Sequence, residues 1–249
     1  MRTGKILVSV FFVIFSGAIV CAQDAVTIPK FNFVEKAETP AEISTTLEIL
    51  FLFTVLAVAP TILVMTTSFA RIAIVLSFLR RALATQTTPP DHILNAMALL
   101  LTFMIMSPTW SRVYSQALGP YFDNEISQKQ AFEKGIQPIR EFMFKQVRKK
   151  DVKLFLDISK TTGVKKKEDI PTLVLIPAFT VSELSKAFIM GFLLYLPFFI
   201  IDMVVASVLM SMGMMMLPPI LVSLPFKILM FVLVDGWNLV IGEVVRSFY

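Results

Sequence analysis

Five charged residues lie within or beside apolar stretches in the last third of the chain: Glu183, Lys186, Asp202, Lys227 and Asp235. An isolated charge at the centre of a bilayer costs at least about 2.5–3.5 kcal/mol, so such residues usually pair and face protein or water. The sequence therefore predicts buried ion pairs, within one chain or between subunits. For Lys227 the alternative is that its long side chain carries the ammonium group to the membrane surface.

Two of these acids, Asp202 and Asp235, raise the possibility of proteolysis, because two carboxylates that share a proton can activate water. In intramembrane aspartyl proteases, however, the second aspartate follows Gly-x-Gly, whereas here Asp235 follows Leu233-Val234. The chain has one cysteine and one histidine, Cys21 and His92. With so few of these residues the sequence predicts no Cys/His zinc site and no Cys–His or Ser–His catalytic pair. It contains no Walker loop and no GxGxxG motif. We expect no cofactor and no enzymatic activity.

The composition is that of a membrane protein. Of the 249 residues, 56% are hydrophobic and only 16% are charged, whereas an average soluble domain has about 25% charged residues. The net charge of +5 is modest, and no basic stripe alternates with aromatic residues as in nucleic-acid binders. We therefore expect an all-α membrane protein and no nucleic-acid partner.

Residues 1–22 have the pattern of a secretory signal peptide. Arg2 and Lys5 form a basic start, Ile6–Val20 is apolar, and small residues precede a cleavage site between Ala22 and Gln23. An uncleaved signal anchor is the alternative. We assign residues 23–46 to a periplasmic N-terminal linker.

Residues 47–111 are predicted to form a first hydrophobic helical hairpin. Thr39-Pro40-Ala41-Glu42 is typical of a helix start, and Ile49–Ala70 is long enough to cross a bilayer, with a kink at Pro60. Arg71, Arg80 and Arg81 follow and indicate the cytoplasmic side. Ile93–Ser111 forms the second uncharged run.

Residues 112–170 are predicted to form an amphipathic helical domain. From Arg112 to Asp169 there are 13 lysines and arginines and 8 acidic residues. Apolar residues recur at helical spacing on this polar background, at Phe132, Ile136, Ile139, Met143 and Val147. Asp151 is expected to cap a short helix that ends at Gly163. We place the domain in the periplasm, because loops of about 60 residues translocate largely regardless of charge.

Residues 171–249 are predicted to form a second hydrophobic hairpin with a methionine-rich loop. Thr180-Val-Ser-Glu183 matches a capping box and is expected to start its first helix. The apolar run Ala187–Ile201 is too short to span a bilayer alone and contains Pro197.

The loop of this hairpin is Met210-Ser-Met-Gly-Met-Met-Met-Leu-Pro-Pro219. Methionine is flexible and polarizable and often fills gaps in a core. Gly213 and Pro218-Pro219 break the stretch, so we expect the helix to stop near residue 217 and the methionines to gather on a bend. A ring of such bends would make a deformable apolar seal.

Several runs resemble the FliP family of flagellar biosynthetic proteins. They are Met65–Gln86 with Pro89-Pro90, Pro177–Leu184, Ile201–Met216, Ser223–Lys227 and Asp235-Gly-Trp237. Together they extend over most of residues 47–249 and are highly specific.

The resemblance implies a core subunit of the flagellar type III protein export gate, in the bacterial inner membrane at the flagellar basal body. It implies helical hairpins wound into a ring-like oligomer of five copies joined by FliR and FliQ, with other export-apparatus subunits, exported flagellar proteins and membrane lipid as further partners. It also implies a gasket that narrows the channel, formed here by Met210, Met212, Met214, Met215 and Met216. A homologous injectisome subunit and a small-solute transporter are the alternatives.

Overall fold

The computed structural model describes residues 40–161, 163, 166–214 and 216–249. The predicted signal peptide, its cleavage site at Ala22 and Gln23, and most of the predicted linker lie outside these residues. The described residues form helices and connecting turns, with no strand among them, so the prediction of an all-α chain is confirmed.

The helices follow one another along the chain with short connections. They are α2 (Pro40–Thr66), α3 (Phe69–Ala82), α4 (Asp91–Val113), the π-helical turn η1 (Tyr114–Leu118), α5 (Gly119–Phe122), α6 (Gln128–Gln146), α7 (Lys149–Ile158), the 3₁₀ turn η2 (Lys167–Asp169), α8 (Thr172–Ser211), α9 (Pro219–Leu233) and α10 (Gly236–Arg246). Residues 1–51 and 52–249 are two separate units. All contacts described below lie within residues 52–249.

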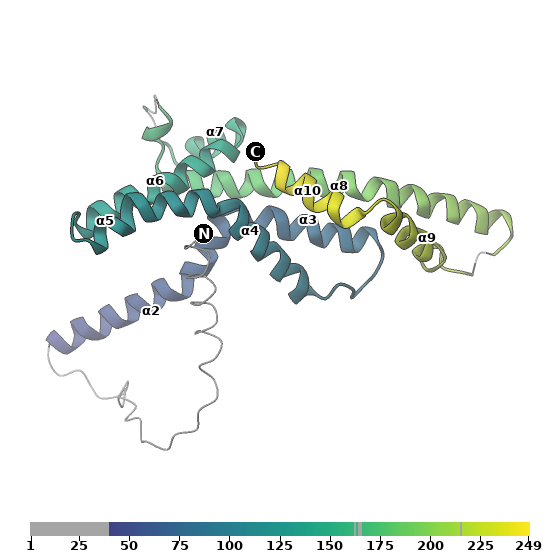
Figure 1. Ribbon diagram of the computed structural model, residues 1–249, viewed down its shortest axis with the longest axis horizontal. Helices are drawn as coiled ribbons and strands as arrows, with labels where there is room; N and C mark the ends of the chain where they lie inside the picture. The colour runs from purple at the N-terminus through teal and green to yellow at the C-terminus, as the bar shows by residue number, and fades with distance from the viewer. Residues whose placement is uncertain (1–39, 162, 164–165, 215) are drawn as a thin grey trace, which may run out of the picture. The chain divides into compact units, whose positions relative to one another are not determined.

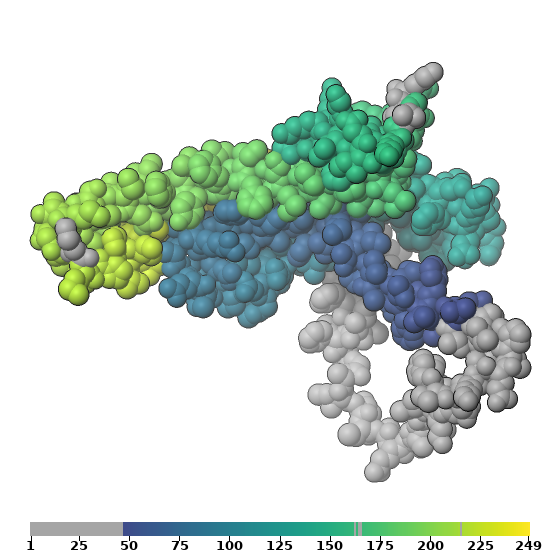
Figure 2. All heavy atoms as spheres, turned by 180° about the vertical axis from the view of Figure 1, so that it is seen from behind, coloured from purple at the N-terminus to yellow at the C-terminus, as the bar shows by residue number. Residues whose placement is uncertain are grey.

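The 40-residue helix α8 is the element on which the second unit is built. Helix α3 packs along its first half, α7 packs near its start, and α9 returns beside its end. Figure 1 shows α8 extending from beside α6 and α7 to the turn that leads into α9. In Figure 2 its surface borders that of α3 and α4.

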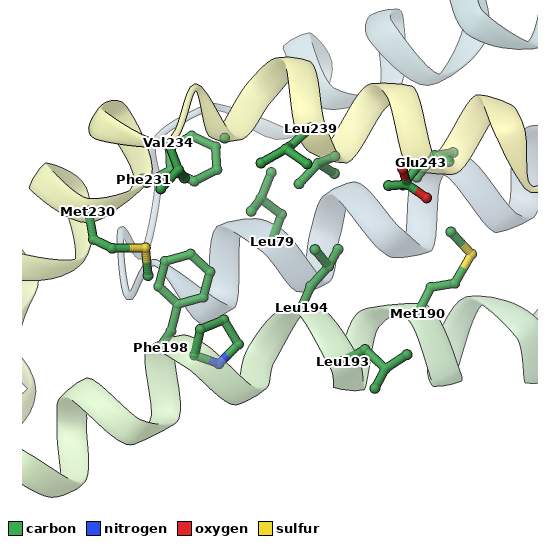
Figure 3. A pocket seen from close by; sticks show the side chains of 14 residues that line it. Leu79, Met190, Leu193, Leu194, Phe198, Met230, Phe231, Val234, Leu239 and Glu243 are labelled. Atoms are coloured by element: carbon green, nitrogen blue, oxygen red, sulfur yellow. The ribbon is translucent and has the colours of Figure 1, made fainter.

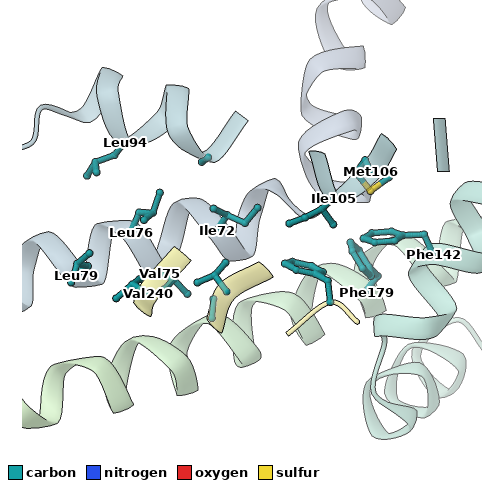
Figure 4. Packing of buried hydrophobic residues seen from close by; sticks show 14 of the residues in the cluster. Ile72, Val75, Leu76, Leu79, Leu94, Ile105, Met106, Phe142, Phe179 and Val240 are labelled. Atoms are coloured by element: carbon teal, nitrogen blue, oxygen red, sulfur yellow. The ribbon is translucent and has the colours of Figure 1, made fainter. Parts of the chain in front are cut away.

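The core forms because α3 presents one apolar stripe. Ile72, Val75, Leu76 and Leu79 recur at intervals of three and four residues, so they share one helix face, and each is at most 1% exposed. This face packs against α8, α4 and α10. Figure 4 shows the stripe together with Leu94 of α4 and Val240 of α10.

An amphipathic helix of the kind expected within residues 112–170 is present as α6. Ser127 caps it, because the Ser127 hydroxyl accepts from the Gln130 N–H and the Gln130 side chain accepts from the Ser127 N–H. Met143 of the predicted apolar stripe is buried, whereas Phe132 is 72% exposed. Only the C-terminal half of the stripe therefore contributes to the core.

Three helical segments are long and apolar enough to cross a membrane: Leu47–Thr66, Asp91–Phe122 and Thr172–Ser211. A fourth candidate is the pair α9 and α10, which is bent by 66°. Between residues 52 and 65 the side chains of α2 are almost all exposed, as is typical of a helix that has lipid or another protein as its neighbour.

Two expected boundaries in the first hairpin differ from the structure. Helix α2 ends at Thr66 and α3 begins at Phe69, so Ile49–Ala70 is not one helix. This break allows α3 to lie along α8 with its apolar stripe buried. Residue 111, the expected end of the hairpin, falls inside a helical segment that continues to Phe122. Pro108 within it does not end the helix.

Four local predictions for the later helices are wrong. Thr180–Glu183 does not begin a helix, because α8 starts at Thr172 and continues through Pro177 and Pro197 to Ser211. It thus ends six residues before the expected stop near residue 217. Helix α7 ends at Ile158 rather than at Gly163, and Asp151 lies inside its first turn instead of capping it. Ser182, Glu183 and Asp151 make tertiary contacts, which a capping pattern in the sequence does not reveal.

Candidate functional site: buried charges and the methionine turn

Arg71 on α3 and Glu183 on α8 form a buried ion pair. The Arg71 Nε donates to Glu183 Oε2 at 2.7 Å, and Nη2 donates to Oε1 of the same carboxylate. The two side chains are 1% and 0% exposed. This fork-on-fork geometry is the strongest that an arginine and a carboxylate can form, and it fixes how α3 sits on α8.

The remaining Arg71 donors bind two further parts of the chain. Nη2 also donates to the side-chain oxygen of Gln146 at 2.9 Å. Nη1 donates to the Ser247 carbonyl at 3.0 Å and to its hydroxyl at 2.8 Å. With five hydrogen bonds, all five guanidinium donors are used. The guanidinium also lies 3.8 Å from the centre of the Phe248 ring, so Arg71 joins α3, α6, α8 and the C-terminal segment.

Lys186, one turn after Glu183, closes this cluster. Its ammonium donates to the backbone carbonyl of Gln146 at 2.6 Å and to the Gln146 side-chain oxygen at 2.9 Å. It lies 3.6 Å from Glu183. Gln146 in turn donates to the Phe248 carbonyl at 2.8 Å. Glu183 and Lys186 therefore share one structural site and hold the end of α6 against α8.

A second buried carboxylate, Asp151, docks α7 on α8. It accepts from the Ser182 hydroxyl at 2.5 Å and from the Arg148 Nε at 2.7 Å, and Arg148 also donates to Ser185 at 2.5 Å. Burial of the carboxyl acts to raise the pKa of Asp151. The hydrogen bonds from Arg148 and Ser182, together with the positive charges of Arg148 and Lys150, outweigh burial, so the pKa of Asp151 is lower than its ordinary value.

Of the two acids predicted as partners for Lys227, the structure places Asp202 beside it. The Lys227 ammonium donates to Asp202 Oδ2 at 2.6 Å, and the Ser223 hydroxyl donates to Oδ1 at 2.5 Å. The Lys227 side chain is 1% exposed and that of Asp202 is 20% exposed. This pair crosses from α8 to α9 and closes the second hairpin.

Asp235 lies apart from this pair, at the bend between α9 and α10. Its backbone has a φ of 50°, a left-handed conformation that aspartate tolerates better than most residues. Its carboxylate accepts from the Asn238 side chain at 3.2 Å. The next residue, Gly236, packs so closely that an added Cβ would lie 2.2 Å from the Phe231 ring. The Asp-Gly pair thus sets the bend.

The methionine stretch lies at the tip of the α8–α9 hairpin. Gly213 has a φ of 76°. Its backbone N–H donates to the Met210 carbonyl at 3.0 Å, and the N–H of the next residue, Met214, donates to the Leu209 carbonyl at 3.0 Å. These two hydrogen bonds form the Schellman motif, which ends many helices at a glycine. Met210, Met212, Met214 and Met216 are 62%, 66%, 39% and 99% exposed, whereas Met215 lies outside the described residues.

These arrangements are suited to holding helices together. Within the described residues no group of three or more His, Cys, Asp or Glu side chains is placed to hold a metal ion. Asp202 is occupied by Lys227 and Ser223, and Asp235 lies at a separate bend, so the two acids do not form the shared-proton pair that aspartyl proteolysis requires.

Comparison with known proteins identifies the family. The model of the FliP family matches residues 52–244. The chain belongs to the FliP family. It is 52% identical to the flagellar biosynthetic protein FliP of Bacillus subtilis over 219 residues, which are 88% of this chain and 99% of that protein.

Other relatives of this FliP-family chain are similar over most of their length. The flagellar biosynthetic protein FliP of Pectobacterium carotovorum is 50% identical over 80% of this chain and 78% of its own. That of Borreliella burgdorferi is 46% identical over 84% of this chain and 83% of its own. The FliP-family match includes α3, α8 and the methionine turn.

Sequence reasoning missed several residues that organise this FliP-family chain. Arg71, which the positive-inside rule assigns to the cytoplasmic side, is buried among Glu183, Gln146 and Ser247. Asp151 is expected as a helix cap, and Ser182 lies inside the capping box expected at Thr180–Glu183. A usable signal for Arg71 was present, because it falls on the same stripe as Val75 and Leu79, where an exposed arginine is not expected.

Proposed function

We propose that this chain is a core subunit of the flagellar type III protein export gate and that it lines a channel through which unfolded flagellar proteins pass. The observation that carries the proposal is the methionine turn. Met210, Met212 and Met216 are each more than 60% exposed at the tip of an apolar hairpin. Apolar side chains on such a tip gain stability only when a neighbouring molecule covers them.

The neighbours are further copies of the same chain, together with FliQ and FliR. Helices α8 and α9 expose large apolar side chains on several faces, among them Phe192, Ile200, Phe226 and Leu229. A ring-like oligomer, with five copies as the expected number, covers these faces and brings the hairpin tips together. The chain acts as a conduit, and the energy for export comes from elsewhere in the apparatus.

The proposed location is the bacterial inner membrane at the flagellar basal body. Residues 112–170, which include α6 and α7, lie on the periplasmic side in this arrangement. Three long apolar helices are compatible with insertion in a bilayer.

In the closed gate the methionine side chains of neighbouring copies form a gasket. Each thioether side chain has three rotatable bonds, so a ring of them can close on itself and deform around a passing chain. Gly213 permits the sharp end of α8 that presents these side chains. Met215 completes the predicted set of five.

Electrical conductance tests this role. The complex is purified with FliQ and FliR and reconstituted into planar bilayers, with Met210, Met212, Met214 and Met216 changed to alanine. We expect a clear rise in ion conductance at unchanged complex yield. Met104→Ala is the control, since Met104 on α4 is also 62% exposed but lies away from the turn. Unchanged conductance in an assembled complex would exclude the gasket.

The names of the relatives favour the flagellar system over an injectisome. A small-solute transporter makes a different prediction, because it would purify as a single chain that retains a bound solute. Native mass spectrometry of the purified complex separates the two, since the export gate gives a multimer with small apolar partners.

A further inference from the structure

Two cavities adjoin each other beside the bend between α9 and α10. One, of about 390 Å³, lies between α3, α8, α9 and α10. The other, of about 250 Å³, lies along α10. They share Val234, Leu239 and Glu243 as lining residues. The two cavities thus meet at these three residues, and their linings differ in chemical character.

The larger cavity is apolar. Its walls include Leu79, Leu194, Phe198 and Met230, whose side chains point into it in Figure 3. Glu243 is the one ionisable residue in its lining and lies towards one end. Its size falls within the range of sites for small ligands, which are mostly apolar with a few placed polar groups.

The smaller cavity is lined by both apolar and polar side chains, and its polar ones follow one face of α10. Asp235, Asn238, Gly242, Glu243 and Arg246 line it, at the spacing of three and four residues that places them in a row. Gly242 leaves room here, since a Cβ added to it would meet no atom within 4 Å. The row contains two carboxylates and one guanidinium, so its net charge is negative.

We propose that this double cavity binds a membrane phospholipid with an amine headgroup, such as phosphatidylethanolamine. One acyl chain fills the apolar cavity, and the headgroup lies in the smaller one. The ammonium binds Glu243, the phosphate binds the neighbouring Arg246, and Asp235 adds negative charge at the far end of the row. The headgroup carries one positive and one negative charge, which match a row with two acids and one base.

Charge complementarity distinguishes this ligand from other lipids. Phosphatidylglycerol offers a phosphate but no amine, so both carboxylates would face a like charge. Phosphatidylcholine carries a quaternary amine without N–H donors, so it cannot donate hydrogen bonds to the carboxylates. The Glu243–Arg246 pair is exposed and 3.0 Å apart. Since such surface pairs contribute little stability, Arg246 can turn to the phosphate at small cost.

Native mass spectrometry tests the proposal on the full chain in its complex. The complex is equilibrated in nanodiscs with equal parts of the three lipids and released, and the retained lipids are counted. We expect phosphatidylethanolamine to be retained in preference to the other two. Leu239→Trp, which fills the apolar cavity, should reduce this retention by about tenfold, equivalent to about 1.4 kcal/mol. Leu233→Trp is the matched control, since Leu233 is 76% exposed on α9 outside both cavities.

Two further variants test the headgroup contacts. Asp235→Asn combined with Glu243→Gln should abolish the preference for phosphatidylethanolamine over phosphatidylglycerol. Arg246→Gln should weaken retention of both. Equal retention of all three lipids by the unchanged protein would overturn the proposal. A complex that retains no lipid and loses subunits with Leu239→Trp would also overturn it, because a neighbouring copy would then occupy the cavity.

This proposal does not depend on the gate function. The methionine-to-alanine changes should alter ion conductance without altering lipid retention. The changes in the lipid site should alter lipid retention without altering the effect of the methionine changes on conductance.

Discussion

Arg71 and Glu183 lie 112 residues apart in the chain and meet in a buried, two-pronged ion pair at the centre of the α3–α8 contact. No bulk water screens the pair, and every guanidinium donor has a partner. A buried pair of this kind is costly to break on one side only, because the remaining charge stays buried.

Removing one partner should therefore destabilise the fold strongly. We expect Glu183→Ala to lower the free energy of unfolding by about 3–5 kcal/mol, as measured by chemical denaturation of the detergent-solubilised chain. Glu243→Ala, which breaks an exposed pair with Arg246, serves as the control and should have little effect. The double change Arg71→Met with Glu183→Leu should cost less than Glu183→Ala alone. A double variant at least as unstable as Glu183→Ala would contradict this.

Charge exchange should identify the partner of Lys227. Lys227→Asp places two acids in a buried site on α9 and should abolish assembly of the complex. Adding Asp202→Lys should restore part of the yield, because the pair is rebuilt with its direction reversed. Adding Asp235→Lys instead should restore none. Complex yield is read by size-exclusion chromatography, and full assembly of Lys227→Asp alone would show that the pair is dispensable.

The docking of α7 on α8 should weaken at acid pH. Because the pKa of Asp151 is lower in the folded chain, its ionised form stabilises the docked state at all pH values above the ordinary aspartate pKa of about 3.9. That stability is lost as the pH falls below about 4 and through the folded pKa. Hydrogen exchange of residues 149–158 between pH 5 and pH 2.5 measures this opening.

Two variants separate Asp151 from general acid effects. Asp151→Asn should expose α7 already at pH 5 and remove most of the pH dependence of exchange in this helix. Asp157→Asn should keep the pH profile of the unchanged chain, since residue 157 is exposed on the same helix. Equal profiles for the two variants would assign the acid effect to other groups.

Deletion of residues 247–249 should loosen the contact between α3 and α6. It removes both acceptors of Arg71 Nη1, the Phe248 carbonyl bound to Gln146 and the ring that stacks on the guanidinium. We expect a loss of about 2–5 kcal/mol, since hydrogen bonds to charged groups contribute about 1.5–3 kcal/mol each. Deleting Tyr249 alone, which is 85% exposed, should be nearly neutral. Thermal unfolding of the two truncated chains compares them.

Gly236→Ala should distort the bend between α9 and α10. The new methyl group would lie 2.2 Å from the Phe231 ring, so we expect a cost of about 1–3 kcal/mol from overpacking. Phe231→Leu in the same chain should recover part of it. Gly242→Ala is the matched control on α10 and should be neutral or stabilising, because its methyl meets open space. Equal stability of the Gly236 and Gly242 variants would show that the bend can adjust.

The sequence predicts those features that depend on local chemistry. The apolar runs predict helices, Gly213 with Pro218-Pro219 predicts the turn, and the cost of a buried charge predicts that Lys227 needs an acid. The length of α8 was not predictable, because Pro177, Pro197 and the capping pattern at Thr180 each indicate an end that packing overrides. Local patterns also cannot show that Arg71 has its partners at residues 146, 183 and 247, since only the folded chain brings these together.

The position of these partners has a consequence for synthesis. Arg71 leaves the ribosome 176 residues before Ser247. Until Ser247 arrives, the guanidinium has Glu183 and Gln146 as partners but lacks the two acceptors of Nη1. The α3–α8 contact can therefore gain its full set of hydrogen bonds only after translation has passed residue 247.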